Sequence, residues 1–154
     1  AACARYGLPL YNALRDLRPE QVWQTIHIGG HRFAGTMVVL PQGLYYGRVA
    51  PEDAPALIDA QERGDLLLNK LRGRSIYPAP VQAAEQTLRE RLGLSAIAAV
   101  RRLRSESIGE QRWQVTLEAN GQAHTLTVEA RKSEFSVRTD TGGEAKPVML
   151  HQVV

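Results

Sequence analysis

Two histidines and a lone cysteine are the residues of this sequence best suited to metal chemistry. His27 and His31 are separated by Ile28 and a Gly-Gly pair, and Cys3 is the single cysteine of the chain. Imidazole nitrogens and thiolate sulfurs are ligands for zinc, copper and iron–sulfur clusters. The pattern therefore predicts a metal site. Because histidines at this spacing also occur by chance, residues that are merely hydrogen-bonded are the alternative interpretation.

The two glycines between the histidines predict a loop. In a helix interior each would cost about 1 kcal/mol relative to alanine. Gly29 and Gly30 can instead adopt positive φ and let the backbone approach a bulky group closely. The alternating residues 22–26 predict a strand that leads into His27.

Composition places the chain among ordinary globular domains. It has 154 residues, 44% hydrophobic and 23% charged, close to the averages for such proteins. No apolar run approaches the roughly 20 residues that cross a bilayer, and residues 1–5 lack the hydrophobic stretch of a signal peptide. A single cysteine excludes an internal disulfide. These observations favour a cytoplasmic protein without a membrane contact.

The charge pattern argues against nucleic-acid binding. The net charge is +3, mostly from arginine, and the densest cluster is Arg101, Arg102 and Arg104. Proteins that bind nucleic acid usually combine basic residues with aromatic residues that stack on the bases. Only 6% of this chain is aromatic, and no aromatic residue lies in the cluster at 101–104. A solvated basic face is expected there, with attraction to an acidic redox partner as a further possibility.

The first half of the chain predicts helices around a hairpin. Leu10, Leu14 and Leu17 recur at helical spacing, whereas Gly7 and Pro9 argue against an earlier helix start. In order, we expect a loop over 1–8, a helix over 9–17, a hairpin of strands 36–40 and 44–49, a helix from Pro51 to Gly64, and an irregular connector over 72–78.

The second half predicts one helix and an antiparallel sheet. The helix runs from Pro80 to Gly93, and residues 97–108 suit either a helix or a strand. Asn120-Gly121 is a strong two-residue hairpin signal. Its register would place Leu117 opposite His124, which makes that histidine a strand-packing residue rather than a ligand. Further strands are expected around 135–137 and 148–154.

Three segments of the chain resemble the sucrase/ferredoxin-like family. They are Cys-Ala-Arg-Tyr-Gly-Leu-Pro-Leu-Tyr (3–11), Val-Trp-Gln-Thr-Ile-His-Ile-Gly-Gly-His-Arg-Phe-Ala-Gly (22–35) and Gly-Leu-Tyr-Tyr-Gly-Arg-Val (43–49). The motif His-x-Gly-Gly-His-Arg-Phe is the most specific part. The similar stretch runs from residue 1 to about 64, and residues 72–85 resemble the segment that follows in the family.

The resemblance implies a [2Fe–2S] cluster in a thioredoxin-like ferredoxin domain. Two cysteines and two histidines hold the cluster in the family, and Cys3, His27 and His31 match three of these ligands. The first family cysteine, with the strand that carries it, would fall before residue 1. We therefore expect a lobe that lacks this N-terminal part and that can be without a cluster in the chain as given.

Four residues are expected around the ligands: Trp23, Gly29, Gly30 and Arg32. The two glycines would let the backbone wrap close to the cluster, and Arg32 and Trp23 are candidates for tuning charge and solvent access. Ordinary positions for two of them are the alternative, with Arg32 on the surface and Trp23 in the core. Replacing anionic thiolates by neutral imidazoles raises cluster potentials, to roughly −150 to +300 mV in Rieske centres against about −400 mV in plant-type ferredoxins.

The resulting hypothesis is an electron-transfer or redox-sensing module that works with a redox partner protein and is a carrier rather than a catalyst. A zinc-stabilised domain would use the same three residues but lacks a Cys-x2-Cys pair. A metal-free interaction domain is the other alternative. No Cys-x-x-Cys of a thioredoxin oxidoreductase and no nucleophile elbow of a hydrolase is found.

The expected fold class is α+β. Residues 1–64 would form a truncated thioredoxin-like (ferredoxin-type) lobe, residues 65–93 a connector and helix, and residues 94–154 a small antiparallel β extension.

Overall fold

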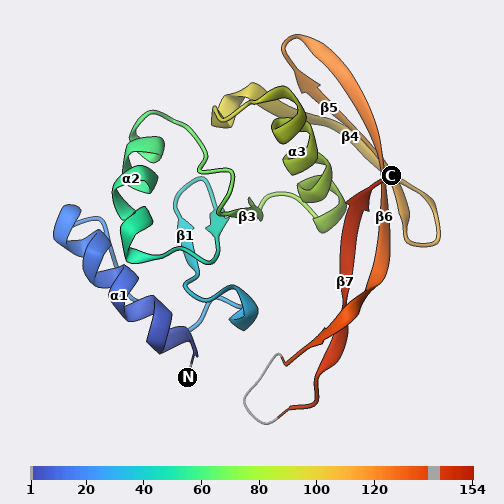
Figure 1. Cartoon of the computed structure of the whole chain (residues 1–154). Coiled ribbons are helices and arrows are strands. Elements are labelled where there is room, and N and C mark those ends of the chain that lie inside the picture. The colour runs from blue at the N-terminus through green and yellow to red at the C-terminus, as the bar shows by residue number, and fades with distance from the viewer. Residues whose placement is uncertain (1, 139–142) are drawn as a thin grey trace.

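The chain folds into an N-terminal region of helices around a small sheet and a C-terminal region of one helix on a larger sheet (Figure 1). The computed structural model describes residues 2–138 and 143–154. This mixture of helices and antiparallel sheets confirms the α+β class. The N-terminal elements are α1 (Ala2–Leu17), the 3-10 turns η1 (His31–Phe33) and η2 (Pro51–Asp53), strands β1 (Met37–Val39), β2 (Leu44–Tyr46) and β3 (Leu71–Arg74), and α2 (Ala54–Glu62).

The first helix begins earlier than the sequence predicts. Residues 2–8 are helical rather than a loop, and Pro9 lies inside α1; residue 1 is outside the described part. Proline removes one helical hydrogen bond. Packing outweighs that loss, because Leu10 and Leu14 on one face of the helix are buried in the N-terminal core. The correction matters for function, since it places Cys3 on a helix.

The small sheet confirms the predicted hairpin and corrects the predicted connector. Strands β1 and β2 pair antiparallel, with Met37 opposite Tyr46 and Val39 opposite Leu44. Residues 71–74 then form β3 on the other side of β2. The sequence Leu-Arg-Gly-Arg has little β-propensity, so this pairing depends on a distant partner strand rather than on local preference.

The segment between α1 and β1 contains no strand. Residues 22–26 have the alternation of a strand, but no neighbouring strand pairs with them. Ile26 is 98% exposed and Trp23 is 81% exposed. The alternation therefore buries no face, and without a covered face or a hydrogen-bonded neighbour the segment stays irregular. The predicted strand is wrong, and the core position considered for Trp23 is wrong as well.

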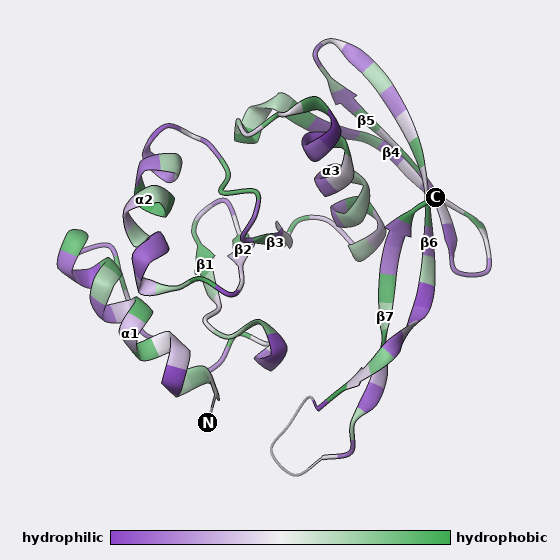
Figure 2. Ribbon diagram, viewed as in Figure 1, coloured by the Kyte–Doolittle hydropathy of each residue, from purple (hydrophilic) through white to green (hydrophobic). Residues whose placement is uncertain are grey.

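The C-terminal region packs one helix on one face of a four-stranded antiparallel sheet (Figure 1). Helix α3 ends at Gly93, which adopts φ of 66° as a helix C-cap. Apolar and polar residues alternate along the strands (Figure 2). The elements are α3 (Ala79–Leu92), η3 (Ile97–Ala99) and strands β4 (Val100–Gly109), β5 (Arg112–Ala119), β6 (Gln122–Val137) and β7 (Lys146–Val153), in the spatial order β4-β5-β6-β7.

The hairpin predicted at Asn120-Gly121 is confirmed in register. Leu117 lies opposite His124 and Val115 opposite Leu126. Both turn residues have positive φ, which this tight turn requires. The ambiguous residues 97–108 divide between η3 and β4, and the two strands expected near the C-terminus are the end of β6 and β7.

A buried ion-pair network ties the two regions together. Arg89 on α3 is fully buried and donates to the carboxylate of Glu85 from Nε and Nη2, at 3.1 and 2.9 Å. The same guanidinium donates to the backbone carbonyls of Leu94, Ala96 and Ile97. Arg74, on β3 of the N-terminal sheet, donates to Glu85 as well. None of the described helices is both long and apolar enough to cross a membrane.

Candidate metal centre

The fold brings the three predicted ligands together. One ligand atom each from Cys3, His27 and His31 lies within 4.8 Å of the other two. The sulfur of Cys3 is 3.1 Å from Nδ1 of His31, and the two imidazole rings stack with centroids 4.5 Å apart. Cys3 is half-buried, whereas both histidines are exposed.

Three different elements position these side chains. Cys3 lies in the first turn of α1, His27 in the irregular segment that follows, and His31 at the start of η1. Gly29 and Gly30 have φ of 85° and 77°, as the sequence predicts. This left-handed turn reverses the chain so that the His27 ring lies on the His31 ring, which a side chain at either glycine would strain.

The donor spacing fits a metal centre. Two donors on one tetrahedral zinc ion are about 3.3–3.7 Å apart, given bond lengths of about 2.0–2.3 Å. The separation of 3.1 Å between Cys3 and His31 is close to that range. The wider spread within the trio, up to 4.8 Å, also leaves room for donors divided between two irons. A thiolate with two imidazoles suits both zinc and iron–sulfur chemistry.

The two candidate tuning residues with long side chains lie at the surface. Arg32 is exposed, as the alternative interpretation predicted, and its guanidinium carbon is 4.6 Å from the centre of the Phe33 ring. Trp23 is in solvent four residues before His27. Solvent thus reaches the centre on the side of the histidines, and a group bound there would be open to water and to other molecules.

Arg72 is the neighbour that the sequence analysis missed. Its Nη1 and Nη2 atoms are each 2.8 Å from the position that a Cβ at Gly30 would occupy. Burial, and next the charge of Arg32, lower the pKa of Arg72. Its Nη1 is buried and has no hydrogen-bond partner. The residue opens the segment 72–85 that resembles the family, which was the available signal.

The other two histidines belong to the C-terminal sheet. His124 lies opposite Leu117 as predicted, and its Nε2 is buried without a partner. His151 on β7 lies 5.5 Å from Trp113, and burial lowers the pKa of its imidazole. Neither joins a described group of three metal-ligating side chains, so both serve as natural controls for His27 and His31.

Comparison with known proteins supports the family resemblance for the region that holds the three ligands. Residues 1–73, just under half of the chain, match the profile of the family described as sucrase/ferredoxin-like. A protein of Meyerozyma guilliermondii named altered inheritance of mitochondria protein 32 is 39% identical over 54 residues. The alignment covers 32% of this chain and 19% of that protein, so the chain matches about a fifth of its length. No solved structure matches the chain.

Proposed function

We propose that the N-terminal region is an iron–sulfur module for electron transfer or redox sensing, with a [2Fe–2S] cluster ligated by Cys3, His27 and His31. The observation that carries the proposal is the convergence of these three donors within 4.8 Å. The family match over residues 1–73 supports it. The resemblance implies a fourth ligand, a second cysteine, at a position that would precede residue 1.

The two imidazoles would set the properties of such a centre. When bound, a [2Fe–2S] cluster accepts and donates single electrons. Because neutral histidines replace anionic thiolates, less negative charge opposes an incoming electron, and the potential should exceed that of an all-cysteine cluster. Each histidine keeps one ring nitrogen that is not a ligand. Both rings are exposed, so this nitrogen can exchange a proton with water.

The exposed histidine side is also the side from which electrons would enter and leave. His27 and His31 reach solvent, whereas Cys3, in the first turn of α1, is half-buried. A redox partner protein would therefore approach over the loop 27–31. The chain offers no enclosing wall on this side within its described residues, which suits a carrier that exchanges electrons with another protein rather than a catalyst that encloses a substrate.

A structural zinc site is the second candidate. It is favoured by one distance, because the 3.1 Å between Cys3 Sγ and His31 Nδ1 is close to the separation of two donors on a single tetrahedral ion. Zinc would require a fourth ligand from water or from another part of the protein. The zinc ion would cross-link α1 to η1 and would carry out no redox chemistry.

Anaerobic loading with iron and sulfide distinguishes the two candidates. The chain, and a longer form that carries a cysteine ahead of Cys3, are compared by visible absorption, by EPR after reduction and by metal content. We expect the longer form to be red-brown and EPR-active, and the chain alone, with three ligands, to load poorly. A colourless protein with one zinc per chain would support the zinc site instead.

Single substitutions in the longer form test the ligands. We expect His27→Ala, His31→Ala and Cys3→Ser each to alter or abolish the visible spectrum. The matched controls His124→Ala and His151→Ala remove the same side chain from the C-terminal sheet and should leave the spectrum unchanged. Unchanged spectra in both His27→Ala and His31→Ala would refute the proposed ligation.

A further inference from the structure

Several arginines near the metal centre have no carboxylate partner among the described residues and gather around one aromatic ring. Most arginines of the chain pair with a carboxylate, among them Arg101 with Glu118 and Arg104 with Glu106. By contrast, three arginines that surround Phe33 form no ion pair within the described residues; they are Arg32, Arg48 and Arg72. We refer to these three residues with Phe33 as the arginine cluster.

The arginine cluster is compact although its members come from separate segments. The guanidinium carbons of Arg72, Arg32 and Arg48 lie 4.3, 4.6 and 5.6 Å from the centre of the Phe33 ring. Each distance is within the range of a cation–π contact. Arg32 belongs to η1, directly after His31, whereas Arg48 follows β2 and Arg72 lies on β3. Positive charge is thus concentrated beside the proposed ligands.

The backbone is shaped to hold these side chains. A Cβ at Gly47 would lie 2.6 Å from Cδ of Arg72, and one at Gly30 would lie 2.8 Å from its Nη1. Arg48 adopts φ of 55°, a conformation that costs a residue other than glycine about 1–2 kcal/mol. Its N–H donates to the carbonyl of Phe33 at 2.8 Å, and its own carbonyl accepts from Lys70.

The positive charge of the arginine cluster is not balanced by the described part of this chain, so it favours binding of an anionic group from another molecule. Three like charges around one ring repel one another, and Arg72 is partly desolvated. Both effects oppose folding unless a counter-charge approaches. In the C-terminal region most arginines have a carboxylate partner, although Arg91 and Arg102 have none among the described residues. Around Phe33, none of the described carboxylates pairs with any of the three arginines.

We propose that the arginine cluster is the docking surface for an acidic patch on the redox partner, and the proposal rests on the electron-transfer function proposed above. Arg32 and Arg48 are exposed, so side chains of an approaching protein can reach them. Charge complementarity of this kind accelerates encounter and fixes orientation. It would direct the partner to the exposed face of His27 and His31.

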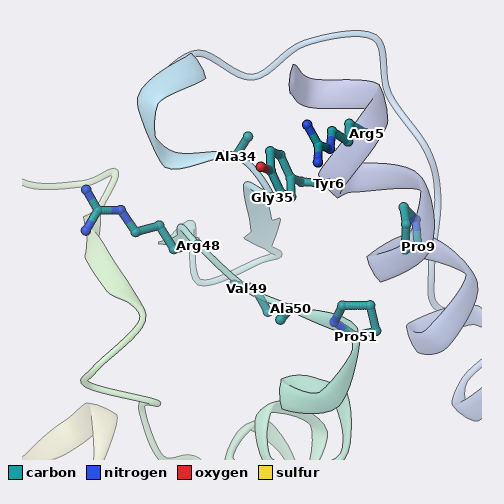
Figure 3. Close-up of a pocket in the computed structure, with 9 residues that line it drawn as sticks. All are labelled: Arg5, Tyr6, Pro9, Ala34, Gly35, Arg48, Val49, Ala50 and Pro51. Atoms are coloured by element: carbon teal, nitrogen blue, oxygen red, sulfur yellow. The ribbon is translucent and has the colours of Figure 1, made fainter. Parts of the chain in front are cut away.

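The surface suits a protein better than an isolated small anion. A cavity of about 270 Å³ opens between α1 and residues 48–51, but its lining is largely apolar (Figure 3). Arg48 extends away from Arg5 and Tyr6 there (Figure 3), so the cavity does not gather the guanidinium groups around one point. Ile26 and Trp23, both strongly exposed on the segment that leads into His27, offer apolar surface of the kind that protein interfaces use.

Binding of an acidic peptide tests the docking surface directly. A fluorescein-labelled oligoglutamate peptide is titrated with the full chain at low ionic strength, and anisotropy reports binding. The double variant Arg32→Gln/Arg48→Gln should bind about tenfold more weakly, and its affinity should depend less on salt. The control Arg101→Gln/Arg104→Gln removes the same net charge from arginines that already have carboxylates. It should change the affinity less than about twofold.

Two results would overturn the proposal. Equal weakening in both double variants would mean that net charge alone attracts the peptide. Displacement of the peptide by inorganic phosphate, under conditions where sodium chloride of equal ionic strength has no effect, would identify a small-anion site instead. Circular dichroism of each variant confirms folding.

The assay also separates this proposal from the proposed function. It needs no metal, and it is run on the chain and on the longer form that carries a cysteine ahead of Cys3, before and after loading. Retained peptide binding in a longer form that fails to load a cluster would refute the iron–sulfur proposal and leave the docking surface standing. The reverse result, a loaded cluster with no selective peptide binding, would refute only the docking surface.

Discussion

The two regions of this protein differ in how completely an arginine side chain is hydrogen-bonded. In the C-terminal region Arg89 is fully buried and satisfied by Glu85 and three backbone carbonyls. In the N-terminal region the partly buried Arg72 has a buried nitrogen without a partner. The first arrangement is complete and therefore structural. The second is incomplete within the chain, which is expected where a ligand or a partner completes a site.

The histidines differ between the two regions in exposure and in backbone regularity. His124 and His151 lie in the regular C-terminal sheet, and the sequence predicts the register of His124, whereas His27 and His31 are exposed on a glycine loop. The region with regular hydrogen bonding provides rigidity, and the irregular region provides the candidate chemistry. This division is common because loops carry function on a rigid scaffold.

We expect the largest loss of stability from a substitution that removes the fully hydrogen-bonded Arg89. Arg89→Met should lower the free energy of unfolding by about 3–5 kcal/mol, because it leaves the Glu85 carboxylate buried beside only Arg74. Urea denaturation measures the change. Arg91→Met, an exposed arginine on the same helix, is the control and should stay within about 0.5 kcal/mol.

Arg72→Met provides the contrasting measurement in the same assay. Removing a charge that the chain does not compensate should change stability by about 1 kcal/mol or less, in either direction. Comparable losses for Arg72→Met and Arg89→Met would show that the contrast between the two regions is not energetic.

The next effect tests whether the two cores unfold together. Leu44 and Leu117 are fully buried, one in each core. Substituting either by alanine should lower stability by about 2–5 kcal/mol. Because the network of Arg74, Glu85 and Arg89 joins the regions, we expect one transition by fluorescence and by circular dichroism in both variants. Two separated transitions would show that the network does not couple the cores.

A smaller effect compares two glycines with similar backbone conformation. Gly121 and Gly29 have φ of 73° and 85°, and a Cβ at either meets nothing within 4 Å. Gly121→Ala should cost about 1 kcal/mol of stability, because the hairpin turn cannot relax. Gly29→Ala should cost less stability, since its loop lies outside both cores. Its effect should appear in metal loading, which depends on the stacking of His27 on His31.

The smallest effects concern the dependence of stability on pH. A hydrogen bond from Lys70, followed by one from the Ala50 N–H, lowers the pKa of Asp53. A lowered folded-state pKa means that this stabilisation is complete above the unfolded value of about 3.9 and is lost as the pH falls through the folded value. Asp53→Asn should flatten the acid limb of stability plotted against pH.

His151 provides the corresponding test in the C-terminal region. Burial lowers its pKa, so the folded protein favours the neutral ring and loses stability as the pH falls below about 6.5. His151→Gln should remove this loss while leaving the acid limb due to Asp53 unchanged. Urea midpoints across this pH range measure both, and a slope that persists near pH 6 in His151→Gln would contradict the assignment.

Local signals made part of the fold predictable. The hairpin of β5 and β6 follows from Asn120-Gly121 and from alternation, both of which act over a few residues. The start of α1 was missed because Pro9 argues against a helix, whereas burial of Leu10 and Leu14 stabilises one. Strand β3 was missed because its partner, β2, lies far away in the sequence and its own residues show no β preference.

The sequence likewise predicts some residues of the candidate site and not others. Cys3, His27 and His31 were found because their side-chain chemistry is rare in this chain and their spacing resembles a known family. Arg72 was not found, because its importance arises from proximity to Gly30 and Phe33 in the folded chain. An arginine in a sequence gives no sign of whether a carboxylate will lie beside it.

The exposure of the histidine loop has a consequence for how selection acts on His27 and His31. Neither His27 nor His31 contributes to either hydrophobic core. We expect a descendant that lost one of them to keep nearly the same melting temperature, because exposed substitutions outside a core change stability little. Selection on folding alone cannot preserve this pair, so their persistence in natural variants would record selection for what they bind.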